Sequence, residues 1–334
     1  MGKYQYVLDK KGSYNKMTIS NSQPDQDTSS SETNLRIKHS LLIICQGPII
    51  SEGMNGGGKW VSYNCLKNIK LYSDSIRLLN YVDFLLVLWS DDFTSEVSDF
   101  LVKNNIKYIV REPVVVKSPN KFIKPEMKKN LYSGTYEGLK FSEGQGYTHV
   151  FRVRTDQYVD FIPHIHKINH SKKDQLVVLG IDTMEPDSLL DLAFGGRFSS
   201  CLDLFDRLTH GKEMHRSIHY DMFYHLPAST EFKRLNNLIY RFYFFIVLDR
   251  RPYINRILEE NVETLDNFNF NDLIWRGSPW LHKGRYISKV EFNQRLKKTY
   301  TISRHKDVIP GIDYLLLPFR IIRKCLRVCF FLQK

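Results

Sequence analysis

The chain has 334 residues and a formal charge of +12, with 42% hydrophobic and 13% aromatic residues. This length and composition exclude both a minimal domain and a wholly disordered chain, because the apolar content is sufficient for a large core. The five cysteines are an odd number without zinc-finger spacing, which argues against a disulfide scaffold and indicates a reducing compartment.

The positive charge is concentrated at one end of the chain. Residues 285–334 contain twelve Lys or Arg against three Asp or Glu, a net charge of +9, which leaves +3 for the first 284 residues. The body of the protein is therefore close to neutral. A basic terminal segment predicts contact with an anionic partner, either a membrane surface or a nucleic acid.

Residues 1–38 are predicted to form a disordered polar leader, because residues 20–34 consist mainly of Ser, Thr, Asn, Gln and Asp. The leader lacks the apolar core of a secretory signal and the Arg-rich face of a transit peptide. No uncharged apolar run in the chain approaches the roughly 20 residues that span a bilayer.

Residues 39–230 alternate short apolar runs with helix-like periodicity. This alternation predicts an α/β domain with a mostly parallel sheet and flanking helices, since strands buried on both faces are continuously apolar. In such sheets the ligand lies beyond the carboxyl ends of the strands. Strands are predicted at 40–45, 83–89, 107–110, 149–153 and 175–181, and helices at 61–79, 94–104 and 130–141.

Arg154 and Asp156 follow the predicted strand at 149–153. A carboxylate at a strand end can bind a divalent cation, Mg²⁺ or Mn²⁺, that bridges the phosphates of a nucleotide-sugar, so Asp156 is the candidate metal ligand. The segment is not a double-aspartate motif, because Arg154 occupies the place of the first acid. Arg154 could instead bind the diphosphate directly and bidentately. A surface ion pair without function is the remaining interpretation.

The acidic segment 182–191 supplies four carboxylates and leads into Gly195 and Gly196. Asp191 is the first candidate to deprotonate an acceptor hydroxyl or to join a metal shell, and Asp187 is the second. Two glycines let a backbone approach a ligand closely. An ordinary acidic loop followed by a turn explains the same residues equally well.

Two other segments that follow predicted strands have weaker interpretations. Asp91 could contact the ribose or base of a nucleoside, or its segment caps the next helix through Asp92 or Thr94. The glycines between positions 53 and 58 lack the Lys-Ser/Thr ending of a P-loop and the spacing of a dinucleotide fingerprint. They predict a plain surface loop rather than one that faces substrate.

The C-terminal third is predicted to be helical, with an extension at 231–313 and a basic amphipathic helix at 314–334. In the last helix, cations alternate with Leu, Ile, Val and Phe. This pattern favours the surface of an anionic membrane, and Cys325 and Cys329 are weak candidates for palmitoylation. A terminal helix packed on the core with a solvated basic face is the alternative.

Four groups of residues occur in a fixed order along residues 39–207. They read IICQGPI at 43–49, SIR at 75–77 with LLVLWS at 85–90, GL at 138–139 ahead of FRVRTD at 151–156, and DLAFG at 191–195 ahead of a helix expected at 200–208. Together they resemble the WavE-type lipopolysaccharide-synthesis proteins, which look like GT-A glycosyltransferases. One departure is the segment 128–132, which reads KKNLY where that family tends to have an Asn-Arg-Gln run.

The resemblance implies a GT-A-like domain that transfers a sugar from a nucleotide-sugar donor to a surface-glycan acceptor, lipopolysaccharide or capsule. It points to Gln46, Arg154, Asp156 and Asp191 as site residues. We expect Gln46 and Asp91 to contact the nucleoside, and Arg154 and Asp156 the diphosphate. The basic end would hold the enzyme on the cytoplasmic face of a membrane, next to a lipid-linked acceptor.

Two alternatives remain from the sequence. A nucleic-acid-binding protein could use the basic tail, but the charge does not extend into the body and no nucleic-acid module is recognisable, so no nucleic-acid partner is expected. A sugar-nucleotide nucleotidyltransferase could use a similar sheet, but its glycine-rich phosphate loop with a following Arg and Lys is not found.

Overall fold

The computed structural model describes residues 4–8, 14–18, 40–114, 125–183, 186, 188–211, 218–227, 251–265, 267–280 and 286–295. Asp187, most of the expected polar leader and the expected basic helix at 314–334 lie outside these residues. Within them, no helix combines the length and the apolar character needed to cross a bilayer.

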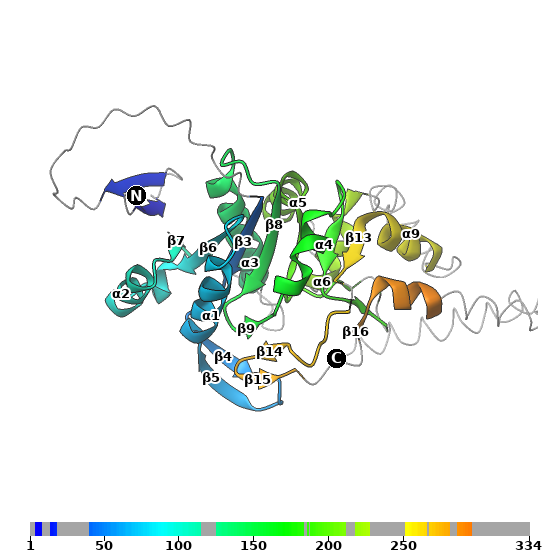
Figure 1. The fold of residues 1–334 in the computed structure, drawn as a ribbon, viewed down its shortest axis with the longest axis horizontal. Coiled ribbons are helices and arrows are strands. Elements are labelled where there is room, and N and C mark those ends of the chain that lie inside the picture. Colours follow the sequence, from blue (N-terminus) through cyan, green and yellow to red (C-terminus); the bar gives the residue numbers. More distant parts are fainter. Residues whose placement is uncertain are drawn as a thin grey trace, which may run out of the picture.

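A nine-stranded sheet forms the centre of the molecule (Figure 1). Its order is β13-β10-β12-β8-β3-β6-β7-β1-β2, and all strands run parallel except β12 and β2. The predicted α/β class with a mostly parallel sheet is therefore confirmed. The strands are β1 (Tyr4–Leu8), β2 (Tyr14–Thr18), β3 (Leu41–Gln46), β6 (Val82–Trp89), β7 (Lys107–Arg111), β8 (His149–Arg154), β10 (Leu176–Val178), β12 (Phe194–Arg197) and β13 (Val262–Thr264).

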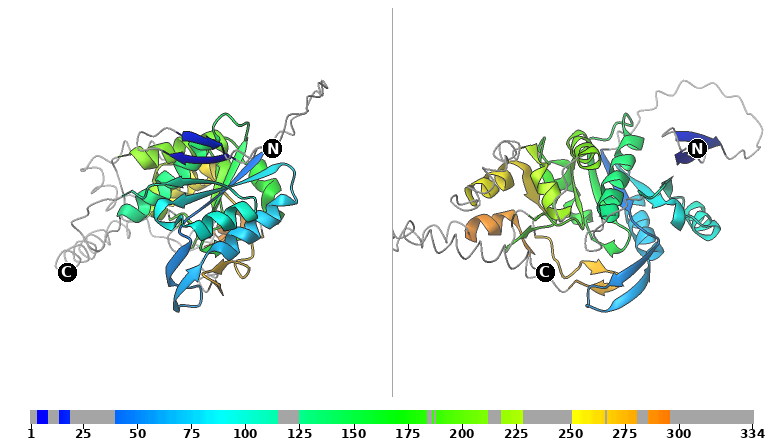
Figure 2. Two further views of the ribbon diagram at one scale, coloured as in Figure 1. Left: turned by 90° about the vertical axis from the view of Figure 1, so that its left-hand side faces the viewer. Right: turned by 180° about the vertical axis from the view of Figure 1, so that it is seen from behind.

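Helices cover both faces of the sheet, as the views in Figure 2 show. One core contains Leu41 and Ile43 of β3, and the other contains Leu42 and Ile44, because successive side chains of a strand point to opposite faces. The first core is covered by α1 (Leu66–Arg77), α2 (Ser95–Lys103) and α4 (Ile165–Asn169), and the second by α3 (Pro125–Ser142), α5 (Phe198–His210), α6 (Ile218–Tyr224) and α9 (Arg251–Asn261).

Helix α3 lies close to the sheet at Gly138. A Cβ atom at this position would lie 3.1 Å from Val87 Cγ2 and 3.2 Å from Ile44 Cδ1. Gly138 of the sequence motif therefore has a packing role, since a larger residue would require Val87 and Ile44 to shift by a few tenths of an ångström.

The hairpin of β4 (Ile50–Met54) and β5 (Trp60–Asn64) corrects two predictions. The glycine-containing segment is the end of a β-hairpin and not a plain surface loop. The helix expected at 61–79 begins only at Leu66, because residues 60–64 pair with β4. The predicted strand at 175–181 also divides into β10 and β11 (Ile181–Asp182), and β11 pairs with β16 (Tyr286–Ile287) in a separate sheet.

The segment expected to be a helical extension from residue 231 contains strands that complete the domain. Helix α9 ends at Asn261, and β13 then pairs in parallel with β10. Strands β14 (Ile274–Trp275) and β15 (Ser278–Pro279) form a second hairpin, which pairs with β9 (Gln157–Tyr158). The boundary expected at residue 230 is corrected accordingly, because apolar residues such as Val262 are buried by pairing with the central sheet.

The expected leader also contributes to the sheet. Strands β1 and β2, inside residues 1–38, form an antiparallel hairpin, and β1 pairs with β7 at the edge of the sheet. Figure 1 shows this hairpin at the N-terminal end of the chain, beside β7.

Candidate active site

The site lies where the order of the strands reverses. From β3 the chain continues to β6 and β7 on one side of β3, and it then returns through α3 to β8 on the other side. The last residues of β3 and β8, Gln46 and Arg154, are register partners. In open α/β sheets the ligand binds at this reversal, beyond the carboxyl ends of the strands.

A cavity of about 530 Å³ opens at these strand ends. Its size lies within the roughly 300–1,000 Å³ of small-molecule sites. Its walls carry three arginines and come from β3, β4, β6, β8 and the β14–β15 hairpin. The lining residues are Gln46, Gly47, Pro48, Ile50, Ser51, Glu52, Trp89, Leu131, Arg152, Arg154, Asp156 and Arg276.

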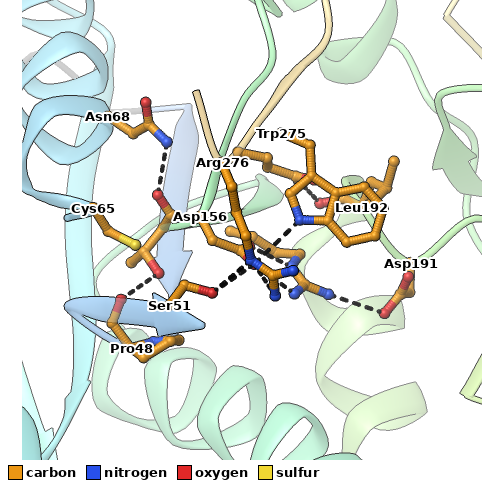
Figure 3. A network of polar contacts seen from close by, with 12 residues as sticks. Pro48, Ser51, Cys65, Asn68, Asp156, Asp191, Leu192, Trp275 and Arg276 are labelled. Carbon is orange, nitrogen blue, oxygen red and sulfur yellow. Dashed lines mark hydrogen bonds and ion pairs between the residues drawn. The ribbon is translucent and has the colours of Figure 1, made fainter. Parts of the chain in front are cut away.

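Asp156 is the centre of the polar network in Figure 3. Its side chain is 1% exposed, and Arg154 donates to both of its oxygens, from Nε at 2.8 Å and from Nη2 at 3.0 Å. Arg276 Nη2 lies 3.2 Å from Oδ2, which also accepts hydrogen bonds from Ser51 Oγ at 3.1 Å and Trp275 Nε1 at 3.4 Å. Burial alone raises the pKa of Asp156, but the two guanidinium groups outweigh it and lower this pKa to about 2.

This network does not fit the predicted role of Asp156 as a ligand of a divalent cation. Both carboxylate oxygens already face cationic or hydrogen-bonding groups, whereas Mg²⁺ and Mn²⁺ need oxygens that are free to coordinate. Within the part of the chain that the structure describes, no group of three or more His, Cys, Asp or Glu side chains is arranged to hold a metal ion. Asp156 instead orients two arginines.

Arg154 connects Asp156 with Asp191. Its Nη1 lies 3.6 Å from Asp191 Oδ2, and its side chain is 22% exposed and reaches the cavity. Burial lowers the pKa of Arg154, but the carboxylates of Asp156 and Asp191 outweigh it and raise this pKa above its ordinary value. Arg154 therefore stays charged, and its partly exposed side chain lines the cavity.

Arg152 also lines the cavity and is buried. Its Nη1 donates to the Asp191 carbonyl at 2.7 Å, and its charge lies 5.3 Å from the centre of the Phe194 ring. Its Nε is buried and has no hydrogen-bond partner among the described residues. Burial lowers the pKa of Arg152 to about 10, so that it remains a cation at neutral pH.

Asp191 lies behind Arg154 and is not one of the lining residues. The two glycines that follow it belong to β12, where a Cβ on Gly195 would lie 2.2 Å from the Val150 carbonyl and one on Gly196 2.5 Å from that of Gln175. They allow close packing of neighbouring strands, which corrects the prediction that they let the backbone approach a ligand.

Gln46 lines the cavity, but its side-chain amide also anchors α3. Its Nε2 donates to the Leu131 carbonyl at 2.9 Å, and its Oε1 accepts from Thr135 Oγ1 at 2.6 Å. The next residue, Gly47, has a φ of +141°, and a Cβ there would lie 2.4 Å from Thr155 Oγ1. Only glycine therefore allows the ends of β3 and β8 to lie this close together.

Asp91 is exposed in a short 3₁₀ turn, η1 (Ser90–Asp92), and is not among the residues that line the cavity. Thr94 caps α2 by accepting a hydrogen bond from the Val97 amide at 3.3 Å, in agreement with the second interpretation of this segment. Trp89, directly before the turn, contributes the aromatic surface of the cavity.

Sequence reasoning missed Ser51, Trp275 and Arg276. Arg276 and Gly277 form the two-residue turn between β14 and β15 with φ values of 46° and 76°, a backbone typical of tight hairpins. The glycine of this pair is a turn signal that the sequence does offer. The contact with Asp156 has no local signal, because Trp275 lies 119 positions after Asp156 in the chain.

Arg276 joins the two hairpins that Figure 1 shows side by side below the sheet. Its Nε donates to Ser51 Oγ at 2.9 Å, and its Nη1 donates to the Met54 carbonyl at 2.7 Å. The contact is close, since a Cβ on Gly53 would lie 2.6 Å from Arg276 Nη1. Arg276 therefore connects the cavity wall of β4 with Asp156.

Comparisons with known proteins show a distant likeness only. No protein-family model matches this chain, and no curated protein matches its sequence. A protein assigned as a glucose-1-phosphate thymidylyltransferase from Bacillus anthracis, solved with sucrose, is 9% identical over 77% of this chain and 94% of its own, with a TM-score of 0.36. Mannose-1-phosphate geranyltransferase from Thermus thermophilus is 12% identical over 57% of this chain and 68% of its own, with a TM-score of 0.30. These values are too low to bear on function.

Proposed function

We propose that the cavity binds the diphosphate of a nucleotide-sugar and that the protein transfers the sugar to a hydroxyl of a surface glycan. The observation that carries this proposal is the set of three arginines on the wall of one cavity at the reversal of strand order. Arg152, Arg154 and Arg276 supply three positive charges, against the two carboxylates that lie beside them, Asp156 and Asp191. One positive charge is left over in this inner part of the cavity, and Glu52, the remaining lining carboxylate, is exposed.

The chemistry of the arginines supports the binding of phosphate. Arg154 uses Nε and Nη2 for Asp156, and its Nη1 faces Asp191 Oδ2 at 3.6 Å, so a phosphate oxygen would share Nη1 with Asp191. Guanidinium groups bind phosphate bidentately and, in a partly buried site, stabilise charge that develops on a leaving diphosphate. This proposal follows the second of the two alternatives from the sequence, in which arginine rather than a divalent cation binds the diphosphate.

The nucleoside is assigned to the side of the cavity formed by β6. Trp89 presents an aromatic ring there, and a nucleobase can stack on such a ring. Gln46, which also lines the cavity, ends the neighbouring strand β3. Trp89 therefore replaces Asp91 as the expected nucleoside contact, because Asp91 is exposed and does not line the cavity.

In the transfer step, the acceptor oxygen forms a bond to the anomeric carbon while the bond from that carbon to the diphosphate oxygen breaks. The nucleoside diphosphate leaves with the electron pair, and the acceptor proton passes to a carboxylate. Because Asp191 is ion-paired with Arg154, we assign it to the orientation of that arginine rather than to proton transfer. Attachment to a membrane through residues 314–334 remains a prediction from their charge and periodicity.

Calorimetric titration with UDP, GDP, ADP and CMP, in EDTA and again in Mn²⁺, tests this function. We expect one nucleotide to bind in EDTA and Arg154→Ala to abolish that binding, while Arg77→Ala, at an exposed arginine of α1, leaves it unchanged. Failure of all four nucleotides to bind in either condition would contradict the proposal. Release of pyrophosphate from a nucleoside triphosphate and a sugar 1-phosphate would favour the nucleotidyltransferase instead.

A further inference from the structure

The β4–β5 hairpin has two faces of different chemistry. Its inner face carries Ser51 and Gly53, which contact Arg276 and, through Ser51, Asp156. Its outer face carries the three cross-strand pairs Ile50–Asn64, Glu52–Ser62 and Met54–Trp60. Paired residues of antiparallel strands share a face, so these six side chains form one continuous surface, which we call the outer hairpin face.

The outer hairpin face leaves large apolar side chains in solvent. Trp60 is 73% exposed, Met54 51% and Ile50 48%. Tryptophan is enriched at interfaces, and adjoining exposed apolar side chains are a feature of interaction sites.

The hairpin is held firmly from its inner side. Asn55 Nδ2 donates to Ser278 Oγ at 2.9 Å, and the Gly56 amide donates to the Trp275 carbonyl at 3.1 Å. Arg276 adds the bonds to Ser51 and Met54 described above. The outer face is therefore presented on a fixed support at the mouth of the cavity, where Ile50 and Glu52 are also lining residues.

Glu52 differs from the other carboxylates of the site. Asp156 and Asp191 both face arginines, whereas the side chain of Glu52 is exposed and forms no hydrogen bond or ion pair with the described residues. A carboxylate that lines the cavity and has no partner in the described part of the chain can accept a proton from a hydroxyl group.

We propose that the outer hairpin face binds the acceptor saccharide, with Trp60 and Met54 against the apolar face of a sugar ring and Glu52 as the group that accepts the proton of its attacking hydroxyl. The proposal rests on the proposed function, because it assigns the second substrate of the same cavity. The new bond joins the acceptor oxygen to the anomeric carbon, the bond to the diphosphate breaks, and the released proton is held on Glu52.

The chemistry of the face favours a saccharide over a lipid surface. Sugars present apolar C–H faces together with hydroxyl groups, which matches a surface where Trp60 and Met54 lie next to the Glu52–Ser62 pair and Asn64. The six side chains include no Lys or Arg to pair with anionic headgroups, and a central carboxylate opposes insertion into hydrocarbon.

Binding of the full chain to a printed array of bacterial oligosaccharides tests the subsite. We expect wild-type protein to bind a subset of the saccharides and Trp60→Ala to lose at least about tenfold in affinity, equal to about 1.4 kcal/mol. Leu78→Ala, which truncates an apolar side chain that is 83% exposed at the end of α1, should bind like wild type. No binding by wild type, or equal binding by Trp60→Ala, overturns the subsite.

The role of Glu52 is tested by the release of nucleoside diphosphate with a bound saccharide as acceptor. We expect Glu52→Gln to lower kcat by about 10²-fold or more while the acceptor KM changes little, since general base catalysis contributes about 10²–10⁴-fold. Unchanged kcat overturns this role. Nucleotide titration of Trp60→Ala and Glu52→Gln separates the acceptor subsite from the donor site. If both variants still bind the nucleotide, the donor site is intact and any lost activity belongs to the acceptor side.

A membrane is the competing partner of the outer hairpin face. A blue shift of Trp60 emission with phosphatidylglycerol vesicles, lost in Trp60→Ala, would assign the face to a membrane and overturn the inference.

Discussion

Arg111 and Arg154 each occupy the last position of a parallel strand, β7 and β8, and each is followed within two residues by a carboxylate. Arg111 is 4% exposed, and its Nη2 donates to Asn130 Oδ1 at 2.7 Å in α3. Arg154 is bound by carboxylates instead and opens to the cavity. The carboxylate that follows Arg111, Glu112, accepts a bond from Ser90 Oγ at 3.0 Å on the surface.

The position of each strand in the sheet explains this difference. Strand β8 neighbours β3 at the reversal of strand order, where the chain diverges and leaves a cavity. Strand β7 lies two places from β3, and the polar side chain at its end anchors the first part of α3. A charged residue at a strand end therefore indicates a ligand site only when the topology leaves space beyond that end.

Asp156→Ala is expected to have the largest effect. Removal of the carboxylate takes the shared partner from the partly buried guanidinium groups of Arg154 and Arg276, which costs about 3 kcal/mol of unfolding free energy, the lower end of the range for a buried pair. Nucleotide binding should also be lost, because Arg154 is no longer oriented. Urea unfolding and calorimetry measure the two effects. Asp74→Ala, which breaks an exposed pair with Lys70, should cost at most about 1 kcal/mol, and equal losses in the two variants would contradict the buried network.

Arg111→Met tests whether the arginine at the end of β7 stabilises the fold without binding the ligand. We expect the unfolding free energy to fall by about 2–3 kcal/mol, because hydrogen bonds from a buried cation to Asn130 and Ser133 are lost. The affinity for the nucleotide should not change, because Arg111 does not line the cavity. Urea unfolding and nucleotide titration of the same preparation check this, and a loss of affinity at unchanged stability would place Arg111 in the site.

Arg154→Lys sharpens the assignment of the diphosphate. Lysine keeps the charge but cannot form the bidentate contacts, so we expect nucleotide affinity to fall about 10- to 100-fold, equal to about 1.4–2.8 kcal/mol. Calorimetry measures this change, with Arg77→Lys on the surface of α1 as the matched control. If Arg154→Lys binds as tightly as wild type, the diphosphate is held elsewhere.

A pH dependence of stability is also expected from the Asp156 network. The pKa of Asp156 is lowered to about 2, below its ordinary value of about 3.9, so its contribution to stability is complete above the ordinary value. This contribution is lost as the pH falls through about 4 toward 2. Urea unfolding between pH 2 and 6 should show a steeper loss for wild type than for Asp156→Asn. Parallel curves would mean that the ion pairs do not stabilise the fold.

Much of the sheet and part of the site could be predicted from local sequence. Apolar runs located β3, β6, β7 and β8 to within about two residues, because a strand buried on both faces leaves a continuous apolar pattern. The same reasoning brought Gln46, Arg154 and Asp156 to one sheet edge, since parallel strands end together. It could not show that Asp156 is ion-paired with two arginines, because one of them, Arg276, belongs to the distant β14–β15 hairpin.

The sequence by itself determined the fold class, the ends of the parallel strands and the charged residues located there, because these depend on the apolar pattern of each segment. Only the tertiary structure decided which strand ends form the cavity, that Asp156 faces guanidinium groups, and that Arg276 and the outer hairpin face belong to the site. The physical reason is that these features depend on pairing between segments far apart in the chain, such as Trp275 with Asp156. Local propensity does not indicate which distant segments lie together, because that depends on the order of the strands in the folded sheet.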